Sequence, residues 1–160
     1  MMNIHILCVG RLKEKFYADA VAEYQKRLSG YCRLQITELP EEKLPQEPSQ
    51  AQIDAALRKE AGAIRAKLPP NSSVAALCVE GRTRSSEELA GLLRTWEIDP
   101  AKHLVFLIGG SYGLDEALKR EAWVRLSMSP MTFPHHLARV MLLEQIYRGF
   151  KINEGSRYHK

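Results

Sequence analysis

The sequence is poor in the features of disulfide-stabilised, secreted and membrane-spanning proteins. It has only 3 cysteines, and Cys8, Cys32 and Cys78 are scattered along the chain. An odd, scattered set is typical of a reducing cytosol, so we expect a cytoplasmic protein with these thiols unpaired. The longest apolar runs, such as residues 104–108, are far shorter than the roughly 20 residues of a membrane span. We therefore expect no signal peptide and no membrane partner.

Several sequence motifs that are typical of a specific chemistry are also missing. No C-x-x-C or H-E-x-x-H spacing occurs, so we expect no metal site. The G-x-G-x-x-G fingerprint is absent after the first predicted strand, and so is the G-x-x-x-x-G-K-[ST] phosphate loop, which removes most support for nucleotide hydrolysis. No G-x-S-x-G elbow marks a nucleophilic serine.

What is present fits an ordinary globular domain with a slightly basic end. The 160 residues, 45% hydrophobic and 26% charged, predict a single domain over residues 1–160. Most of the net charge of +4 lies in the last thirty residues, which hold five basic residues against two acidic ones. A basic terminal segment favours a phosphate-rich partner, although a solvated helix face accounts for the charge equally well.

The hydrophobic pattern alternates between short apolar runs and helical faces. The runs predict strands at residues 2–9, 32–39, 74–79, 103–108 and 123–127, and the faces predict helices at residues 17–28, 53–68, 85–96, 115–121 and 135–152. Such alternation predicts an α/β fold with a mainly parallel sheet flanked by helices. Ligands bind beyond the carboxyl ends of such strands, so the candidate loops are residues 80–84, 109–114 and 128–134.

Two local patterns stand out in these loops and in the last helix. Gly109-Gly110 follows a buried strand, where missing Cβ atoms permit either a close ligand or a tight turn. On the last helix His135 lies four residues before Arg139, and Glu144 lies four residues before Arg148, so each pair shares a face. The spacing fits a ligand site and also a solvated helix face.

Ordered motifs along nearly the whole chain resemble a known family. They are ILCVGRLK at 6–13, EYQKRL at 23–28, LIGGSYGL at 107–114, MTFPH at 131–135, LEQIYRGF at 143–150 and the terminal YHK. This set is similar to the small ribosomal-RNA-modifying members of the SPOUT, or α/β-knot, methyltransferases. The resemblance implies a C-terminal deep trefoil knot, which general folding rules treat as a rare exception.

The resemblance also implies a cofactor, a substrate and an assembly. The cofactor is S-adenosyl-L-methionine. The substrate is a pseudouridine of 23S rRNA in the assembled ribosome, methylated at ring nitrogen N3. The protein acts as a homodimer, which we also expect because the apolar stripe of Leu143, Tyr147 and Phe150 needs a cover.

Carried over residue by residue, the resemblance assigns the cofactor contacts. They are Leu77, Gly109, Met128, Ser129, Pro130, Met131, Thr132 and Phe133. The family does not settle the other roles, and we predict RNA contacts at Arg139, Tyr158, His159 and Lys160. The ring nitrogen must lose a proton before it attacks the methyl group. His135 and Glu144 are the candidate bases, and Arg148 is the residue expected to stabilise the anionic ring.

Two other interpretations remain open at this point. The chain is either a SPOUT methyltransferase with a different RNA target, or a non-catalytic module that binds ribosomes through its basic tail. Binding of S-adenosyl-L-methionine distinguishes an enzyme from a pure binder.

Overall fold

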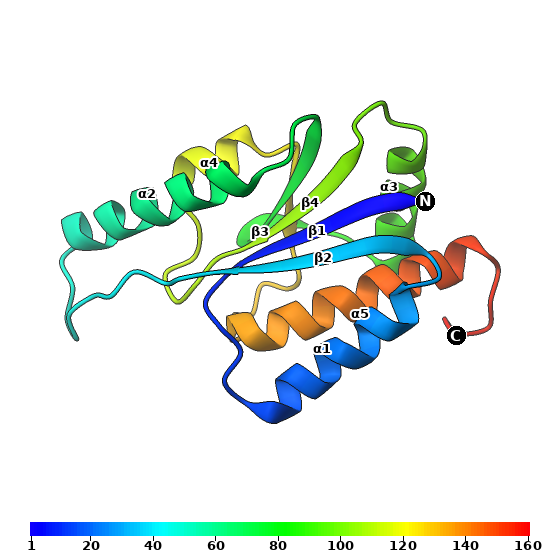
Figure 1. The fold of residues 1–160 in the computed structure, drawn as a ribbon, viewed down its shortest axis with the longest axis horizontal. Helices are drawn as coiled ribbons and strands as arrows, with labels where there is room; N and C mark the ends of the chain where they lie inside the picture. Colours follow the sequence, from blue (N-terminus) through cyan, green and yellow to red (C-terminus); the bar gives the residue numbers. More distant parts are fainter.

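Five parallel strands form one sheet in the order β2-β1-β4-β3-β5. The computed structural model describes all 160 residues. The strands are β1 (Met2–Val9), β2 (Cys32–Leu39), β3 (Ser72–Thr83), β4 (His103–Ile108) and β5 (Val124–Ser127). A helix follows each strand (Figure 1), and the first four helices make the crossovers that consecutive parallel strands need. The predicted parallel sheet flanked by helices is confirmed.

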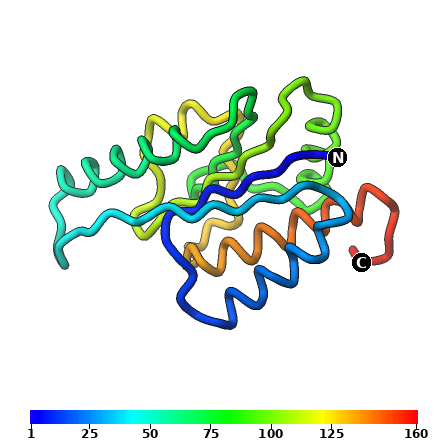
Figure 2. Tube along the Cα trace, in the orientation of Figure 1, coloured from blue at the N-terminus to red at the C-terminus, as the bar shows by residue number.

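Helices cover both faces of the sheet. Helices α1 (Lys15–Leu28), α3 (Ser86–Glu97) and α5 (His135–Asn153) pack on one face, and α2 (Gln50–Lys67) and α4 (Glu116–Glu121) pack on the other (Figure 1). The trace in Figure 2 shows β2 continuing into an extended segment, residues 40–49, that leaves the sheet before α2 begins. None of the helices combines the length and apolar content of a membrane span.

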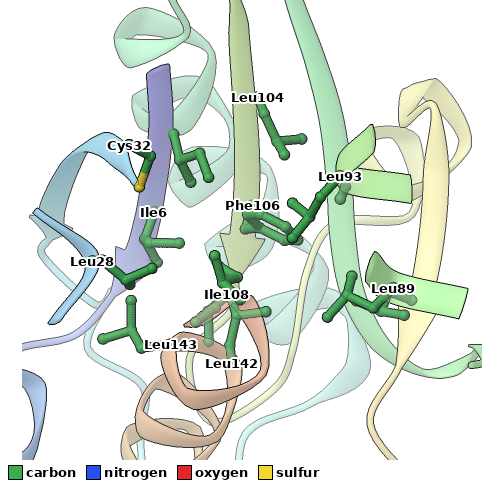
Figure 3. Close-up of a cluster of buried hydrophobic side chains, with 14 of the residues drawn as sticks. Ile6, Leu28, Cys32, Leu89, Leu93, Leu104, Phe106, Ile108, Leu142 and Leu143 are labelled. Atoms are coloured by element: carbon green, nitrogen blue, oxygen red, sulfur yellow. The ribbon is translucent and has the colours of Figure 1, made fainter. Parts of the chain in front are cut away.

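Alternation along the central strands supplies both halves of the core. In β4, Leu104, Phe106 and Ile108 face α1, α3 and α5, whereas Val105 and Leu107 face α2 and α4. Figure 3 shows side chains of α1, α3 and α5 meeting those of β1 and β4. Full burial of each such side chain contributes roughly 1.5–3 kcal/mol to the free energy of folding. The buried central strands are therefore rigid, and the loops at their carboxyl ends start from fixed positions.

Strand β3 is the main departure from the predicted elements. The sequence predicted a strand over residues 74–79 and a loop over 80–84, but β3 runs from Ser72 to Thr83. Its pairing with β5 is interrupted, because Leu126 faces both Leu77 and Arg82. Residues 78–81 therefore form a bulge, which re-aims side chains beside the strand end. The trefoil knot depends on the threading of the chain, which the strand order does not test, so it stays a prediction.

Candidate functional site

A cavity of about 650 Å³ opens where β3, β4 and β5 end. Its walls come from residues 77–80, 108–114 and 128–134, with Lys119 of α4 and the first turn of α5. These are the carboxyl ends of neighbouring parallel strands, the position where ligands bind in such sheets. Figure 1 shows α5 beginning below this edge of the sheet.

The cavity gathers the predicted cofactor residues. Seven of the eight line it, and these are Leu77, Gly109, Met128, Ser129, Met131, Thr132 and Phe133. Pro130 lies in the same loop without lining the cavity. The three segments are far apart in the sequence, so their meeting at one place is a property of the fold.

The glycine loop after β4 closes on itself. Gly113 N–H donates to the Gly110 carbonyl at 3.1 Å, and a Cβ placed on Gly109 would lie 2.2 Å from the Gly113 carbonyl oxygen. The Glu41 carboxylate accepts from the Ser111 N–H at 2.7 Å and anchors the loop to the segment after β2. The turn itself therefore requires glycine at 109, and the cofactor contact predicted for Gly109 stays a prediction.

The second wall is the loop of residues 128–133, whose backbone groups make few hydrogen bonds within the protein. Ser127 Oγ donates to the Ser129 carbonyl at 3.0 Å, and Met131 N–H donates to Ser129 Oγ at 3.0 Å. No residue from 128 to 133 takes part in the backbone–backbone hydrogen bonds made outside helices and strands. Backbone groups of Thr132 and Phe133 are thus available to the edge of a planar ligand.

Large apolar side chains are exposed around the same opening. Val79, Tyr112 and Met131 line the cavity and are 48%, 48% and 72% exposed. Exposed apolar groups gathered on a concave surface favour a ligand or a partner over water.

The cavity also holds one pair of opposite charges that the sequence did not predict. Lys119 Nζ is paired with Glu80 and, at 2.7 Å, with Glu116. The side chain of Lys119 is only 10% exposed. Burial is the largest single influence on the pKa of Lys119 and lowers it, but the two carboxylate partners together outweigh burial, so the pKa is raised.

His135 is the one predicted catalytic residue that lines the cavity. Burial, followed by the charge of neighbouring His136, lowers the pKa of His135 below its ordinary value of 6.5. The two imidazole rings lie 4.2 Å apart between centroids. His135 is therefore mostly neutral at pH 7, and its neutral form can accept a proton.

Arg139 does not fit the RNA contact predicted for it. It is 2% exposed, its Nη1 lies 2.7 Å from Glu38, and its Nη2 donates to the Gly10 carbonyl at 3.1 Å. The guanidinium ties α5 to the ends of β1 and β2 from inside the protein. The spacing of four from His135 gave no information about burial, because Glu38 is distant in the sequence.

The other predicted polar residues form a separate cluster at the carboxyl end of α5. Arg148 donates twice to Glu144, at 3.0 and 2.6 Å, and its guanidinium lies 4.8 Å from the Tyr158 ring centroid. Tyr158 donates to Glu144 at 3.1 Å, and His159 bridges Arg148 and Glu87 of α3. The tail is thus packed on α5, with Lys160 exposed at its end.

The two groups of residues do not meet within one chain. At a rise of 1.5 Å per residue, Glu144 and Arg148 lie about 14 and 20 Å along α5 from His135. The sequence correctly placed these side chains on α5, but the expected joint site with His135 is not formed inside the monomer.

The whole chain matches a family model. Residues 2–159 fit the model described as "Predicted SPOUT methyltransferase". The sheet, the strand-end cavity and this match together define the class of protein: the chain belongs to the SPOUT methyltransferase family.

Curated relatives share almost the full length of the chain. It is 43% identical over 159 residues to "Ribosomal RNA large subunit methyltransferase H" of Streptococcus equi subsp. zooepidemicus (strain MGCS10565), covering 99% of this chain and 100% of that protein. The protein of the same name from Streptococcus uberis (strain ATCC BAA-854 / 0140J) is 44% identical over the same shares of both chains. These matches confirm the resemblance.

A solved structure agrees at the level of the fold. It is described as "The structure of a probable methylase family protein from Haemophilus influenzae Rd KW20", with a TM-score of 0.55 and 14% identity. The match covers 96% of this chain and 67% of that chain.

No group of three or more His, Cys, Asp or Glu side chains has the arrangement of a metal site.

Proposed function

We propose that residues 1–160 form one cytoplasmic methyltransferase domain that uses S-adenosyl-L-methionine to methylate N3 of a pseudouridine in 23S rRNA of the assembled ribosome. The observation that carries the proposal is the meeting of seven implied cofactor residues around one cavity. The name shared by the relatives supports an RNA of the large ribosomal subunit as the substrate. The pseudouridine and its N3 position follow from the resemblance.

The cavity suits the size and chemistry of an adenosyl cofactor. A volume of about 650 Å³ lies within the range of small-molecule sites, roughly 300–1,000 Å³. Leu77 and the exposed Met131 offer apolar surface to a planar base, and the 128–133 backbone offers donors and acceptors to its edge. When bound, the cofactor supplies an activated methyl group on a sulfonium.

The protein's own contribution is to position the target base and remove its proton. Neutral His135 in the cavity wall accepts the proton of ring nitrogen N3. A cationic guanidinium such as that of Arg148 stabilises negative charge that develops on the neighbouring ring carbonyls. The base must leave its stack to enter the cavity, which a single-stranded loop of RNA permits at low cost.

The separation along α5 implies that a second chain completes the site. Leu143 and Phe150 are buried inside the monomer, so the predicted need to cover the α5 stripe is wrong and does not support dimerisation. The dimer proposal rests instead on the family and on Arg148, which lies about 20 Å from His135 of its own chain. In a two-fold dimer, the tail cluster of one subunit faces the cavity of the other.

The substrate is tested with ribosomes from cells that lack the gene. Purified protein and S-adenosyl-L-methionine should add one methyl group to one pseudouridine, identified by mass spectrometry of 23S rRNA fragments. Methylation of another nucleotide or RNA would overturn the substrate, and a blank cofactor titration would support the non-catalytic module.

The shared site is tested with two defective subunits. One lacks residues 158–160, and the other carries Gly109→Ala in the cavity. Each homodimer should be inactive, whereas the mixture should regain about a quarter of wild-type activity, since about half of the dimers are mixed and each has one complete site. A mixture that stays inactive would show that the tail serves its own chain.

A further inference from the structure

The bulge in β3 places an acidic side chain in the cavity wall. Glu80 lies in residues 78–81, between the two points where Leu126 pairs with β3. A Cβ on neighbouring Gly81 would lie 2.9 Å from backbone carbons of both Arg125 and Leu126, so the bulge has room only for glycine there. Bulges of this kind aim side chains at sites beside a sheet.

Lys119 of α4 holds the Glu80 carboxylate in place. Its ammonium group pairs with Glu80 inside the cavity and with Glu116, which does not line the cavity. Burying the Lys119 side chain to 10% exposure is unfavourable unless opposite charges surround it. The hydrogen bond from Lys119 is the main cause that lowers the pKa of Glu80, so Glu80 is an anion at neutral pH.

Glu80 is also the only acidic side chain that lines the cavity, and Lys119 is the only lysine or arginine there. Lys119 is nearly buried between two carboxylates, so its own ammonium group is not accessible to a ligand. The charged group of this pair that a ligand can reach is the carboxylate of the half-exposed Glu80. A fixed carboxylate accepts hydrogen bonds and has none to donate. It therefore selects donors on a ligand.

On the basis of the proposed function, we propose that Glu80 is a cofactor-binding residue whose carboxylate accepts hydrogen bonds from the ribose hydroxyls or the α-ammonium group of the adenosyl cofactor. Lys119 is a positioning residue that acts through Glu80. The remaining walls supply apolar surface and backbone groups, so Glu80 provides the one charged contact to the cofactor.

Calorimetry with S-adenosylhomocysteine tests the proposal without measuring activity. Glu80→Gln should weaken binding at least about tenfold, the effect of losing a hydrogen bond to a charged group. Glu116→Gln is the matched control, because it removes the other partner of Lys119 outside the cavity. It should leave the affinity within about twofold of the wild type.

A second ligand identifies the donor. 5′-Methylthioadenosine keeps the ribose hydroxyls and lacks the amino-acid group. If Glu80→Gln weakens both ligands equally, the ribose hydroxyls are the donors. If it weakens only S-adenosylhomocysteine, the donor is the α-ammonium group.

Three results separate failure of the proposal from other failures. Equal affinity of the wild type and Glu80→Gln for S-adenosylhomocysteine overturns the role of Glu80. A wild type that binds neither ligand overturns the proposed function itself. If thermal unfolding shows that Glu80→Gln is not folded, Glu80→Asp takes its place, since it keeps the charge but shortens the side chain, and an unchanged affinity of that variant also overturns the proposal.

The positioning role of Lys119 has its own readout. Lys119→Met should raise the pKa of the Glu80 carboxyl, followed by NMR, and should weaken S-adenosylhomocysteine binding. Lys119→Arg should restore both properties, because it keeps the positive charge. A Lys119→Met variant with weakened binding but an unchanged Glu80 pKa would assign Lys119 a purely structural role.

Discussion

The two ends of α5 differ in how many of their polar groups are already bonded within the protein. At the amino end, His135 borders a cavity with exposed apolar walls and unused backbone groups. At the carboxyl end, Arg148, Glu144 and the tail residues satisfy one another in a closed cluster. The first end has an open cavity, which is where we propose that the cofactor binds. The second is a closed charged cluster, for which we propose a role only when a partner chain faces it.

The largest expected effect is at the open end. Gly109→Ala places a Cβ 2.2 Å from the Gly113 carbonyl oxygen, so the backbone of the loop must move. In catalysis a misplacement of about 1 Å can cost roughly 100-fold in rate, and we expect a loss of comparable size in S-adenosylhomocysteine affinity, measured by calorimetry.

The matched control for this variant is Gly91→Ala in α3. A Cβ at Gly91 meets nothing within 4 Å, and the helix gains about 0.5–1 kcal/mol of stability. Its cofactor affinity should not change. Normal binding by Gly109→Ala would remove the 109–113 loop from the cofactor site.

The next effect concerns the connection between the two ends. Arg139→Met leaves Glu38 and the Gly10 carbonyl without their buried partner, and the free energy of unfolding should fall by about 3 kcal/mol in urea. Lys15→Met breaks an exposed pair with Asp19 and should cost less than about 1 kcal/mol. A stable Arg139→Met protein whose ribosome binding loses salt dependence would restore the predicted RNA contact.

Arg139 also shows where sequence reasoning reached its limit. Apolar runs and helical faces were sufficient to predict the order of the strands and helices, because a strand buried on both faces, such as β4, has few polar residues. Burial of one arginine depends on Glu38, which reaches it only through the tertiary fold. The bulge at 78–81 was missed for a similar reason: Glu80-Gly81-Arg82 has the composition of a turn, and only pairing with β5 keeps it in the strand.

The candidate site also contains residues that the sequence predicted and residues that only the three-dimensional structure brings together. The sequence showed glycines after a buried strand and a loop before a helix, and the family resemblance supplied the cofactor-binding role that we propose for them. Lys119 was not predicted, because a lysine on a short helix has the pattern of a solvated surface residue. Its partner Glu80 lies on another element, so only the three-dimensional structure brings the pair together.

At the closed end, Arg148→Ala should impair the reaction and spare the cofactor. Loss of a group that stabilises developing charge typically costs about 100-fold in rate, measured as methyl transfer to purified ribosomes. S-adenosylhomocysteine affinity should stay within about twofold. Arg148→Lys should not restore the rate, since one ammonium cannot reproduce the two bonds to Glu144 and the contact with Tyr158. Equal losses of rate and cofactor affinity would place Arg148 at the cofactor.

The smallest effect is the pH dependence assigned to His135. Only the neutral imidazole accepts the proton of the ring nitrogen, so kcat/KM should fall as the pH drops through the pKa of His135. Burial, then the charge of His136, lowers that pKa, so the midpoint of the loss should lie below 6.5, the pKa of an unperturbed histidine. His136→Gln removes the second-largest of the causes that lower this pKa and should move the inflection upward. S-adenosylhomocysteine affinity, measured over the same range, separates loss of the base from loss of the cofactor. An inflection above 6.5, or a rate that does not respond to pH at all, would exclude His135 as the base and leave Glu144 of a partner chain as the remaining candidate.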